Sequence, residues 1–99
     1  MDGENAEKWW EEGNRLYMAG EFAGAIASYD KALAIKPEHQ NAWYNRGAVL
    51  LALRKYEQAI ASYDEALEIK PEDHEAWYYR GIALGNLRKY EQALASYNK

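Results

Sequence analysis

The sequence contains no cysteine, only two prolines and a single phenylalanine among 99 residues. Without cysteine the chain can form no disulfide, no thiolate metal site and no cysteine nucleophile, and this composition suits a reducing compartment. The longest apolar run, residues 48–53, is far too short to cross a bilayer. The first residues, 1–5, are polar and acidic and do not resemble a signal peptide. We therefore expect a soluble, cytoplasmic protein with no membrane partner.

Positive charge is also scarce. The chain has 12 Lys and Arg residues against 16 Asp and Glu, which gives a formal net charge of −4. The basic residues are interleaved with acidic ones, which is typical of solvated helix faces, so we expect no nucleic-acid partner. The sequence contains no glycine-rich phosphate loop and no nucleophile elbow. We predict no enzymatic activity, no catalytic residue and no cofactor.

The most informative feature of the chain is an internal repeat. Trp9, Trp43 and Trp77 lie 34 residues apart, and several other residues recur at the same interval. These are Gly13, Gly47 and Gly81, then Ala25, Ala59 and Ala93, then Tyr29, Tyr63 and Tyr97, and finally Pro37 and Pro71. A fixed period of this length indicates a stack of similar supersecondary units. Such stacks favour extended binding surfaces over reaction centres.

The repeat divides the chain into one domain of three units, residues 6–39, 40–73 and 74–99. Each unit reads as two helices. In the second unit they are predicted at about Asn41–Leu53 and Tyr56–Ile69, because apolar residues recur there at helical spacing. About three units are the usual minimum for a stable stack, so we expect marginal stability.

A glycine in the middle of a predicted helix needs a physical reason, because it costs about 1 kcal/mol relative to alanine. We expect Gly47 and Ala59 to let the two helices of the second unit cross closely. The rings of Trp43 and Tyr63 would then fill the space on either side.

These residues resemble the tetratricopeptide repeat family, whose pattern is W-x2-L-G-x2-Y, then A-x3-F, then P. The second unit matches it with Trp43, Gly47, Ala59, Tyr63 and Pro71, and the other units match in the same way. The resemblance implies an all-α fold, a right-handed superhelical solenoid of antiparallel helix pairs. The first helix of each pair would line a concave groove. It also implies binding of peptides or protein segments, without catalysis.

The chain departs from the family pattern at the residue before each repeated glycine. The usual leucine is replaced by Glu12, Arg46 and Arg80. Glu12 has the opposite charge to Arg46, but we expect an ordinary surface ion pair, worth under about 1 kcal/mol. The turn glycine of the family is present as Gly20 and is replaced by arginine in the later units.

The resemblance also assigns residues to the groove. They are Glu7, Trp10, Glu11, Asn14 and Tyr17 in the first unit, Asn41, Tyr44, Asn45, Ala48 and Leu51 in the second, and Glu75, Tyr78, Tyr79, Ile82 and Asn86 in the third. Trp10, Tyr44 and Tyr78 recur at the repeat interval and should form a row of aromatic rings. We predict that the peptide-binding residues are Trp10, Asn14, Tyr44, Asn45, Tyr78 and Tyr79.

Two interpretations of the aromatic residues remain open. Aromatic rings offer contact area with few rotors to immobilise, which favours peptide binding. Tyr44 and Tyr78 could equally pack against neighbouring helices and only stabilise the stack. Trp10 favours binding, because a second tryptophan beside Trp9 is surplus to the core.

One subfamily binds the terminal carboxylate of chaperone tails with lysines, an arginine and two asparagines. Asn14 and Asn45 match the two asparagines of that clamp, whereas Trp10, Glu75 and Tyr79 occupy the basic positions. A carboxylate would be poorly held without cations. We therefore expect the groove to prefer a neutral, apolar or somewhat basic segment.

The two histidines, His39 and His74, fall in what we interpret as equivalent loops between units. No third ligand or carboxylate recurs with them, so we expect exposed loop residues and no metal site.

The third unit stops before the segment that would correspond to Ala66–Ile69. Solenoids need capped ends, so Leu94 and Tyr97 should face water. Two explanations compete: the chain is a fragment of a longer repeat protein, or this end binds another copy of the chain. The leading hypothesis is a scaffold that binds a peptide in the groove, and its rival is a repeat segment that self-associates through this end.

Overall fold

The computed structural model describes the backbone of residues 2–98 and the side chains of residues 5–98. Within that range the chain forms six helices and no strand. The helices are α1 (Asp2–Met18), α2 (Phe22–Ile35), α3 (Gln40–Ala52), α4 (Tyr56–Ile69), α5 (His74–Asn86) and α6 (Tyr90–Tyr97). The second helix of the second unit has the predicted bounds, and the first begins and ends one residue earlier than predicted.

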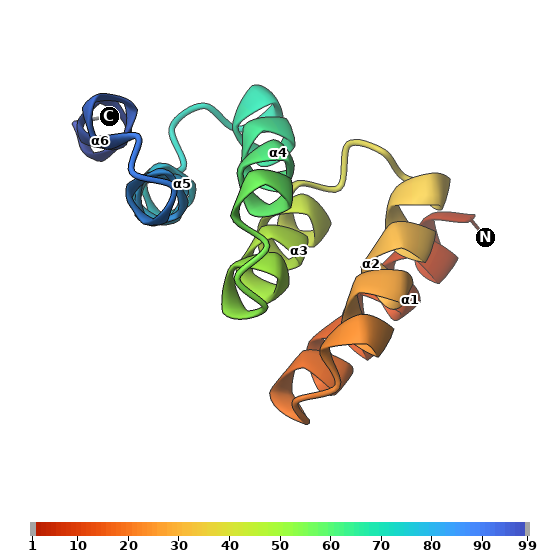
Figure 1. Cartoon of the computed structure of the whole chain (residues 1–99). Coiled ribbons are helices and arrows are strands. Elements are labelled where there is room, and N and C mark those ends of the chain that lie inside the picture. Colours follow the sequence, from red (N-terminus) through yellow and green to blue (C-terminus); the bar gives the residue numbers. More distant parts are fainter. Residues whose placement is uncertain (1, 99) are drawn as a thin grey trace.

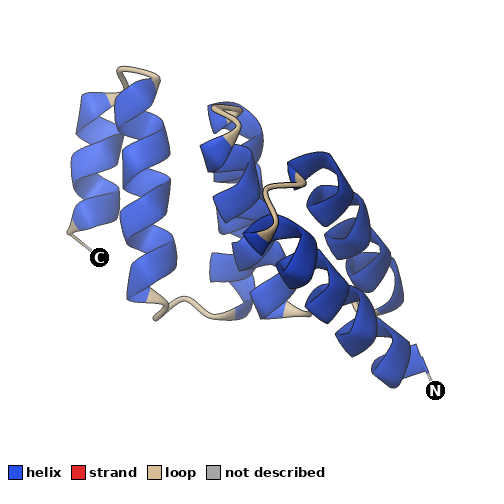
Figure 2. Cartoon of the chain, turned by 90° about the horizontal axis from the view of Figure 1, so that it is seen from below, coloured by secondary structure: helices blue, strands red, loops and turns tan. Residues whose placement is uncertain are grey.

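The helices pack as three antiparallel pairs, α1 with α2, α3 with α4, and α5 with α6. Each pair also contacts the next one, through α2 and α3 and then through α4 and α5. Successive pairs are turned relative to one another, so the two ends of the chain lie far apart (Figures 1 and 2). The molecule is elongated, with extents of 43 × 26 × 17 Å. This arrangement is the predicted all-α stack of helix pairs.

The repeated glycine and tyrosine face each other inside every pair. A Cβ atom added at Gly47 would lie 2.9 Å from the ring of Tyr63, closer than real Cβ atoms approach such groups. The same ring contact occurs at Gly13 and Gly81. Ala59 is completely buried, as expected for a close helix crossing. The glycine therefore leaves room for the tyrosine ring, which occupies the space that a side chain would take.

Trp43 has a different position from the one we predicted. It is half-buried and packs against the core of the first pair, which includes Tyr29 and Leu33. Its indole Nε1 donates to the carbonyl oxygen of Pro37 at 2.7 Å. The tryptophan thus fastens α3 to the loop and the pair that precede it, while the atoms nearest to a Cβ at Gly47 belong to the Tyr63 ring.

The arginine that replaces the family leucine forms a link between repeats. Arg46 Nε donates to Asp30 of the preceding pair at 2.7 Å, and its Nη1 donates to the buried Ser62 at 2.7 Å. Glu12 pairs with Arg15 of its own helix, so the Glu12–Arg46 pair that we considered does not form. The same link recurs in the third pair, formed by Arg80, Asp64 and Ser96.

Our expectation for the histidines is wrong for His39. This side chain is only 8% exposed and forms the N-cap of α3, since its Nδ1 accepts from the Ala42 amide at 3.1 Å. Its Nε2 lies 3.2 Å from Glu7. The residue equivalent to His39 is Asp73, which caps α5 in the same way, so the two histidines are not equivalent. An N-cap must accept a hydrogen bond, and a histidine fills that role less commonly than aspartate.

The turns inside the pairs have the same backbone shape in all three units. Gly20 has a φ of 80°, and Arg54 and Arg88, which replace it, have φ values of 61° and 63°. A left-handed conformation is unfavourable for a residue with a Cβ. The turn keeps its left-handed backbone after the replacement. Both arginines are therefore locally strained.

Candidate functional site

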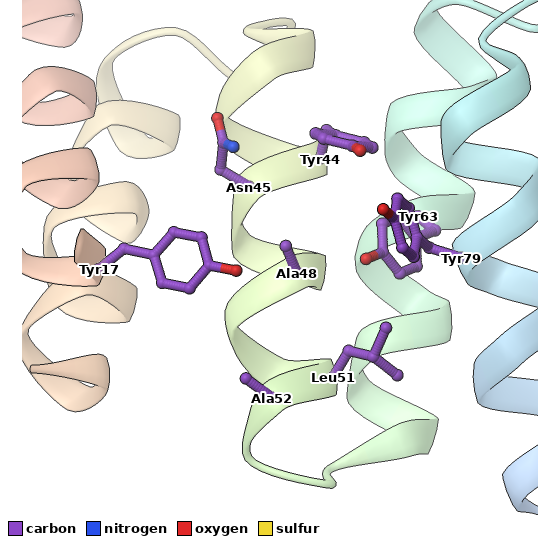
Figure 3. Close-up of a pocket in the computed structure, with 8 residues that line it drawn as sticks. All are labelled: Tyr17, Tyr44, Asn45, Ala48, Leu51, Ala52, Tyr63 and Tyr79. Carbon is purple, nitrogen blue, oxygen red and sulfur yellow. The ribbon is translucent and has the colours of Figure 1, made fainter. Parts of the chain in front are cut away.

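A hollow of about 400 Å³ opens between the first helices of the three pairs (Figure 3). Its lining residues come from α1, α3, α4 and α5, and they are Tyr17, Tyr44, Asn45, Ala48, Leu51, Ala52, Tyr63 and Tyr79. Figure 3 shows the hydroxyl of Tyr17 pointing toward Ala48 from one side. The rings of Tyr63 and Tyr79 present their hydroxyls from the other side.

The polar groups of the hollow are phenol hydroxyls and one amide, and none of its lining residues is charged. Burial, followed by the nearby charge of Glu75, raises the pKa of Tyr44 to about 12. Burial also raises the pKa of Tyr63. Both phenols are therefore neutral at physiological pH, and each offers one donor and acceptor group on a flat apolar ring.

The tyrosines around the hollow contact one another. The rings of Tyr44 and Tyr63 have centroids 5.9 Å apart in an edge-on arrangement, and the rings of Tyr63 and Tyr79 stack with centroids 6.5 Å apart. Tyr79 also contacts Tyr78, at 5.2 Å, and Tyr78 contacts Tyr97, at 5.8 Å. The aromatic row therefore runs from Tyr44 through Tyr79 to Tyr78 and the last helix.

We predicted that Trp10 would belong to this aromatic row, but it does not. Its ring lies 5.4 Å from the ring of His39, and its Nε1 donates to Oδ1 of Asn45 at 2.8 Å. The hydrogen bond fastens α1 to α3 and orients the amide of Asn45 at the edge of the hollow. Trp10 thus contacts a lining residue without lining the hollow itself.

Asn14 is used inside its own pair. Its Oδ1 accepts a hydrogen bond from the hydroxyl of Tyr29 at 2.5 Å, between α1 and α2. Asn14 therefore satisfies a buried phenol of the first repeat, and it does not line the hollow. Of the predicted binding residues, the hollow brings together Tyr44, Asn45 and Tyr79, with Tyr78 beside them and 54% exposed.

Sequence reasoning missed two residues of the hollow, Ala52 and Tyr63. It placed Tyr63 in the core, where the residue does lie, at 0% exposure. It named Ala48 only as a groove position. Ala48 occupies the place that Asn14 has in the first repeat, and comparison of those two positions was the signal that could have located the hollow.

The last pair presents apolar side chains to solvent. Leu94 is 60% exposed and Tyr97 is 44% exposed, as the sequence led us to expect. Tyr90 is also exposed on the same helix. The equivalents of Leu94 in the other pairs, Ile26 and Ile60, are partly buried.

The described residues contain no group of three or more His, Asp or Glu side chains arranged to hold a metal ion. None of the helices between residues 2 and 98 is both long enough and apolar enough to cross a membrane.

Comparison with known proteins identifies the family. A tetratricopeptide repeat family model matches residues 11–74 and 49–99, which together span most of the chain. The fold agrees with that match, and the chain belongs to the tetratricopeptide repeat family. Among curated protein sequences, none matches.

Solved structures of similar fold include two that exceed one quarter sequence identity. The tetratricopeptide repeat domain of Arabidopsis OM64 is 27% identical, with a TM-score of 0.94 over 97% of this chain and 79% of that chain. The first such domain of Spaghetti (RPAP3), bound to the HSP90 peptide SRMEEVD, is 26% identical, with a TM-score of 0.94 over 99% of this chain and 78% of that chain.

A crystal structure of MamA shares the fold at 24% identity, with a TM-score of 0.93 over 95% of this chain. Our chain spans only 55% of that MamA chain.

Proposed function

We propose that this chain is a protein-interaction module of three repeats, which binds a peptide or protein segment in its concave groove. The observation that carries the proposal is the neutral hollow lined by four tyrosines and one asparagine. Largely apolar hollows with a few convergent polar groups are the usual form of a binding site. Tyrosine rings provide large contact areas at low entropic cost. The proposal requires no catalytic group, no nucleic acid and no membrane.

The similar structures support this proposal. The RPAP3 domain that shares this fold binds an HSP90 peptide. The structure of the CopN–Scc3 complex also contains a chain of this fold, at 25% identity and with a TM-score of 0.90. These neighbours support binding of a peptide or protein segment.

The chemistry of the groove disfavours an acidic peptide. The positions that correspond to cations in the carboxylate-binding subfamily are Trp10, Glu75 and Tyr79, none of which is basic. The oxygen atoms of Asn14 and Asn45 accept from Tyr29 and Trp10, so these residues offer a carboxylate only neutral amide N–H donors. We therefore propose a neutral or somewhat basic segment as the partner.

The proposal can be tested by selecting binders from a displayed peptide library and measuring them by calorimetry. We expect the selected peptides to lose at least about tenfold in affinity with the Tyr44→Ala, Tyr78→Ala double variant. Tyr90→Ala is the matched control, because Tyr90 is an exposed tyrosine on α6 that does not line the hollow. Circular dichroism checks that each variant is folded.

Two results would count against the proposal. One is a set of selected peptides that bind the double variant as tightly as the parent chain. The other is micromolar binding of the acidic peptide SRMEEVD, which would contradict the preference for neutral or basic segments.

A second candidate function is association between copies of this chain through α6. The exposed Leu94 and Tyr97 favour it. Light scattering coupled to size exclusion measures the mass over a wide concentration range. Association predicts a mass that grows with concentration and returns to that of a monomer in Leu94→Glu. A monomer at every concentration would exclude this function, and the groove variants should leave the mass unchanged in either case.

A further inference from the structure

The equivalent buried tyrosines of the first two repeats differ in their hydrogen bonding. In the first, Tyr29 is 0% exposed and its hydroxyl donates to Oδ1 of Asn14. In the second, Tyr63 is also 0% exposed, yet its hydroxyl is the one buried side-chain polar atom among the described residues that has no hydrogen-bond partner. Buried polar groups are nearly always hydrogen-bonded, so an exception requires an explanation.

The cause is a single difference in sequence. The residue 34 positions after Asn14 is Ala48, which has no group that can accept a hydrogen bond. The hollow opens beside this alanine, where the first repeat has a carboxamide. The equivalent residue of the third repeat is Ile82, whose larger side chain is also apolar. Only the second repeat therefore combines a small residue with a buried, unpartnered phenol.

We propose that the hollow beside Ala48 binds the side-chain carboxamide of a glutamine or asparagine in a peptide ligand. The amide oxygen would accept from the Tyr63 hydroxyl, as Oδ1 of Asn14 accepts from Tyr29. This inference rests on the proposed function, because it names the side chain that the groove selects in its peptide partner. The first repeat supplies the observed example of the bond.

The surrounding groups fit an amide better than the alternatives. A ligand carboxylate would find no cation among the lining residues and would approach Glu75, whose charge already acts on Tyr44. A purely apolar side chain would leave the Tyr63 hydroxyl without a partner. The amide nitrogen of the ligand would meet the Tyr17 hydroxyl, which points toward Ala48 (Figure 3). A carboxamide therefore matches the donor on one side and an acceptor on the other.

The rings of Tyr44 and Tyr79 contact the Tyr63 ring and help to cover it. Both are partly exposed, and no hydrogen bond among the described residues holds either hydroxyl. The Tyr63 hydroxyl is buried in the free chain, so a ligand would reach it by rotating one of these side chains aside. Binding is favourable because the ligand amide provides the hydrogen-bond acceptor that the Tyr63 hydroxyl lacks in the free chain.

The first experiment needs no ligand and tests the unpartnered hydroxyl. Ala48→Asn supplies the carboxamide from the chain itself, so we expect a higher melting temperature. Tyr63→Phe removes the unsatisfied hydroxyl and should leave the melting temperature unchanged or raised. The matched variant in the first repeat, Tyr29→Phe, removes a formed hydrogen bond and should lower it. Equal losses in Tyr29→Phe and Tyr63→Phe would overturn the inference.

The second experiment uses acetylated and amidated alanine-rich peptides that differ only in a central Gln, Leu or Glu. We expect the Gln peptide to bind at least about tenfold more tightly than the other two, measured by NMR titration. Tyr63→Phe should abolish this preference, because the donor is lost. Ala48→Asn should abolish binding of the Gln side chain, because the chain fills its own hollow.

Failure of the inference and failure of the proposed function give different results. Peptides selected from the library that depend on Tyr44 but bind Tyr63→Phe and Ala48→Asn normally would overturn the carboxamide site and retain the peptide groove. Equal binding of the Leu and Gln peptides would do the same. If neither the selected peptides nor the Gln peptide depend on Tyr44, both proposals are wrong.

Discussion

The second and third repeats contain the same glycine–tyrosine contact but bury it to different extents. Tyr63 of the second repeat is 0% exposed, whereas Tyr97 of the third is 44% exposed. The contacts to the glycine are similar in both, since a Cβ at Gly47 or Gly81 would collide with the tyrosine ring of its own pair. The difference therefore arises outside the helix pair.

The following repeat causes the difference. Tyr79 of α5 stacks on the Tyr63 ring and contributes to the covered side of the second repeat. Among the described residues no helix follows α6, so Tyr97 lacks the equivalent of Tyr79. Each repeat of a solenoid completes the core of its neighbour, and its stability depends on nearest-neighbour contacts. The same covering by Tyr79 also encloses the hollow in which we place the ligand.

The largest effect should come from removing the buried ring. Tyr63→Ala should destabilise the chain by about 3–5 kcal/mol, as for other large aromatic side chains truncated in a core. Tyr97→Ala should cost under about 2 kcal/mol, because much of that ring is already in water. Chemical denaturation followed by circular dichroism measures both values.

Equal losses in these two alanine variants would contradict the role of the following repeat. A Tyr63→Ala chain that is already unfolded without denaturant would agree with the prediction only if Tyr97→Ala remains folded. The two variants can therefore be compared by whether they fold, even when one is too unstable for a full unfolding curve.

The second prediction concerns the glycines that face these rings. A Cβ at Gly81 would come within 2.5 Å of Tyr97, closer than the 2.9 Å at Gly47. Gly47→Ala should nevertheless be the more destabilising change and should lower the free energy of unfolding by about 1–2 kcal/mol. The buried Tyr63 ring has nowhere to move, whereas the exposed Tyr97 can turn into solvent. Gly81→Ala should be close to neutral, since alanine improves helix propensity by about 1 kcal/mol.

Thermal unfolding of the two glycine variants decides this point. A larger loss for Gly81→Ala would mean that the distance in the folded chain, and not the freedom of the ring, controls the cost.

The repeat itself could be predicted from the sequence, because its causes lie in residue types at a fixed interval. Gly47 and Ala59 indicated a close crossing, and the structure places the Tyr63 ring against that glycine. The bounds predicted for the two helices of the second unit were correct to about one residue. These features depend on local pattern and on the packing of one helix pair.

Features that join residues of different repeats were not predictable. His39 is buried where Trp10 and Glu7 of α1 lie against it, which no local pattern indicates. The hollow depends on the absence of a side-chain amide at Ala48 and on the cover that Tyr79 gives to Tyr63. A missing group leaves no motif in a sequence, so it becomes visible only when the surrounding side chains are in place.

The third prediction concerns the effect of high pH on the buried and partly buried tyrosines of the second repeat. Burial raises the pKa of Tyr63, and burial followed by Glu75 raises the pKa of Tyr44 to about 12, from an ordinary value of 10.0. The unfolded chain then loses these protons near pH 10 while the folded chain retains them. Stability should thus be fully present below pH 10 and fall as the pH rises toward 12, by up to about 1.4 kcal/mol per pH unit for a fully buried tyrosine.

Unfolding measured between pH 9 and pH 12 tests this alkaline loss, because that range spans the ordinary tyrosine pKa of 10.0 and the raised pKa of Tyr44, about 12. Tyr63→Phe should reduce the loss, because phenylalanine has no proton to release. The exposed Tyr90→Phe is the control and should leave the curve unchanged. A curve for Tyr63→Phe identical to that of the parent chain would contradict the prediction.

The smallest effect is expected at the arginine links, where the two repeats should not differ. Arg46 bonds to Asp30, and Arg80 bonds to Asp64, at 2.7 Å and 2.6 Å. In both links the acidic partner comes from the preceding repeat, and a preceding repeat is present for Arg46 and for Arg80 alike. Arg46→Ala and Arg80→Ala should each cost about 1 kcal/mol, because each loses a half-exposed ion pair and a hydrogen bond to a buried serine. Thermal unfolding should give nearly equal losses. A markedly larger loss for Arg46→Ala would mean that this link, like the burial of Tyr63, also depends on the repeat that follows.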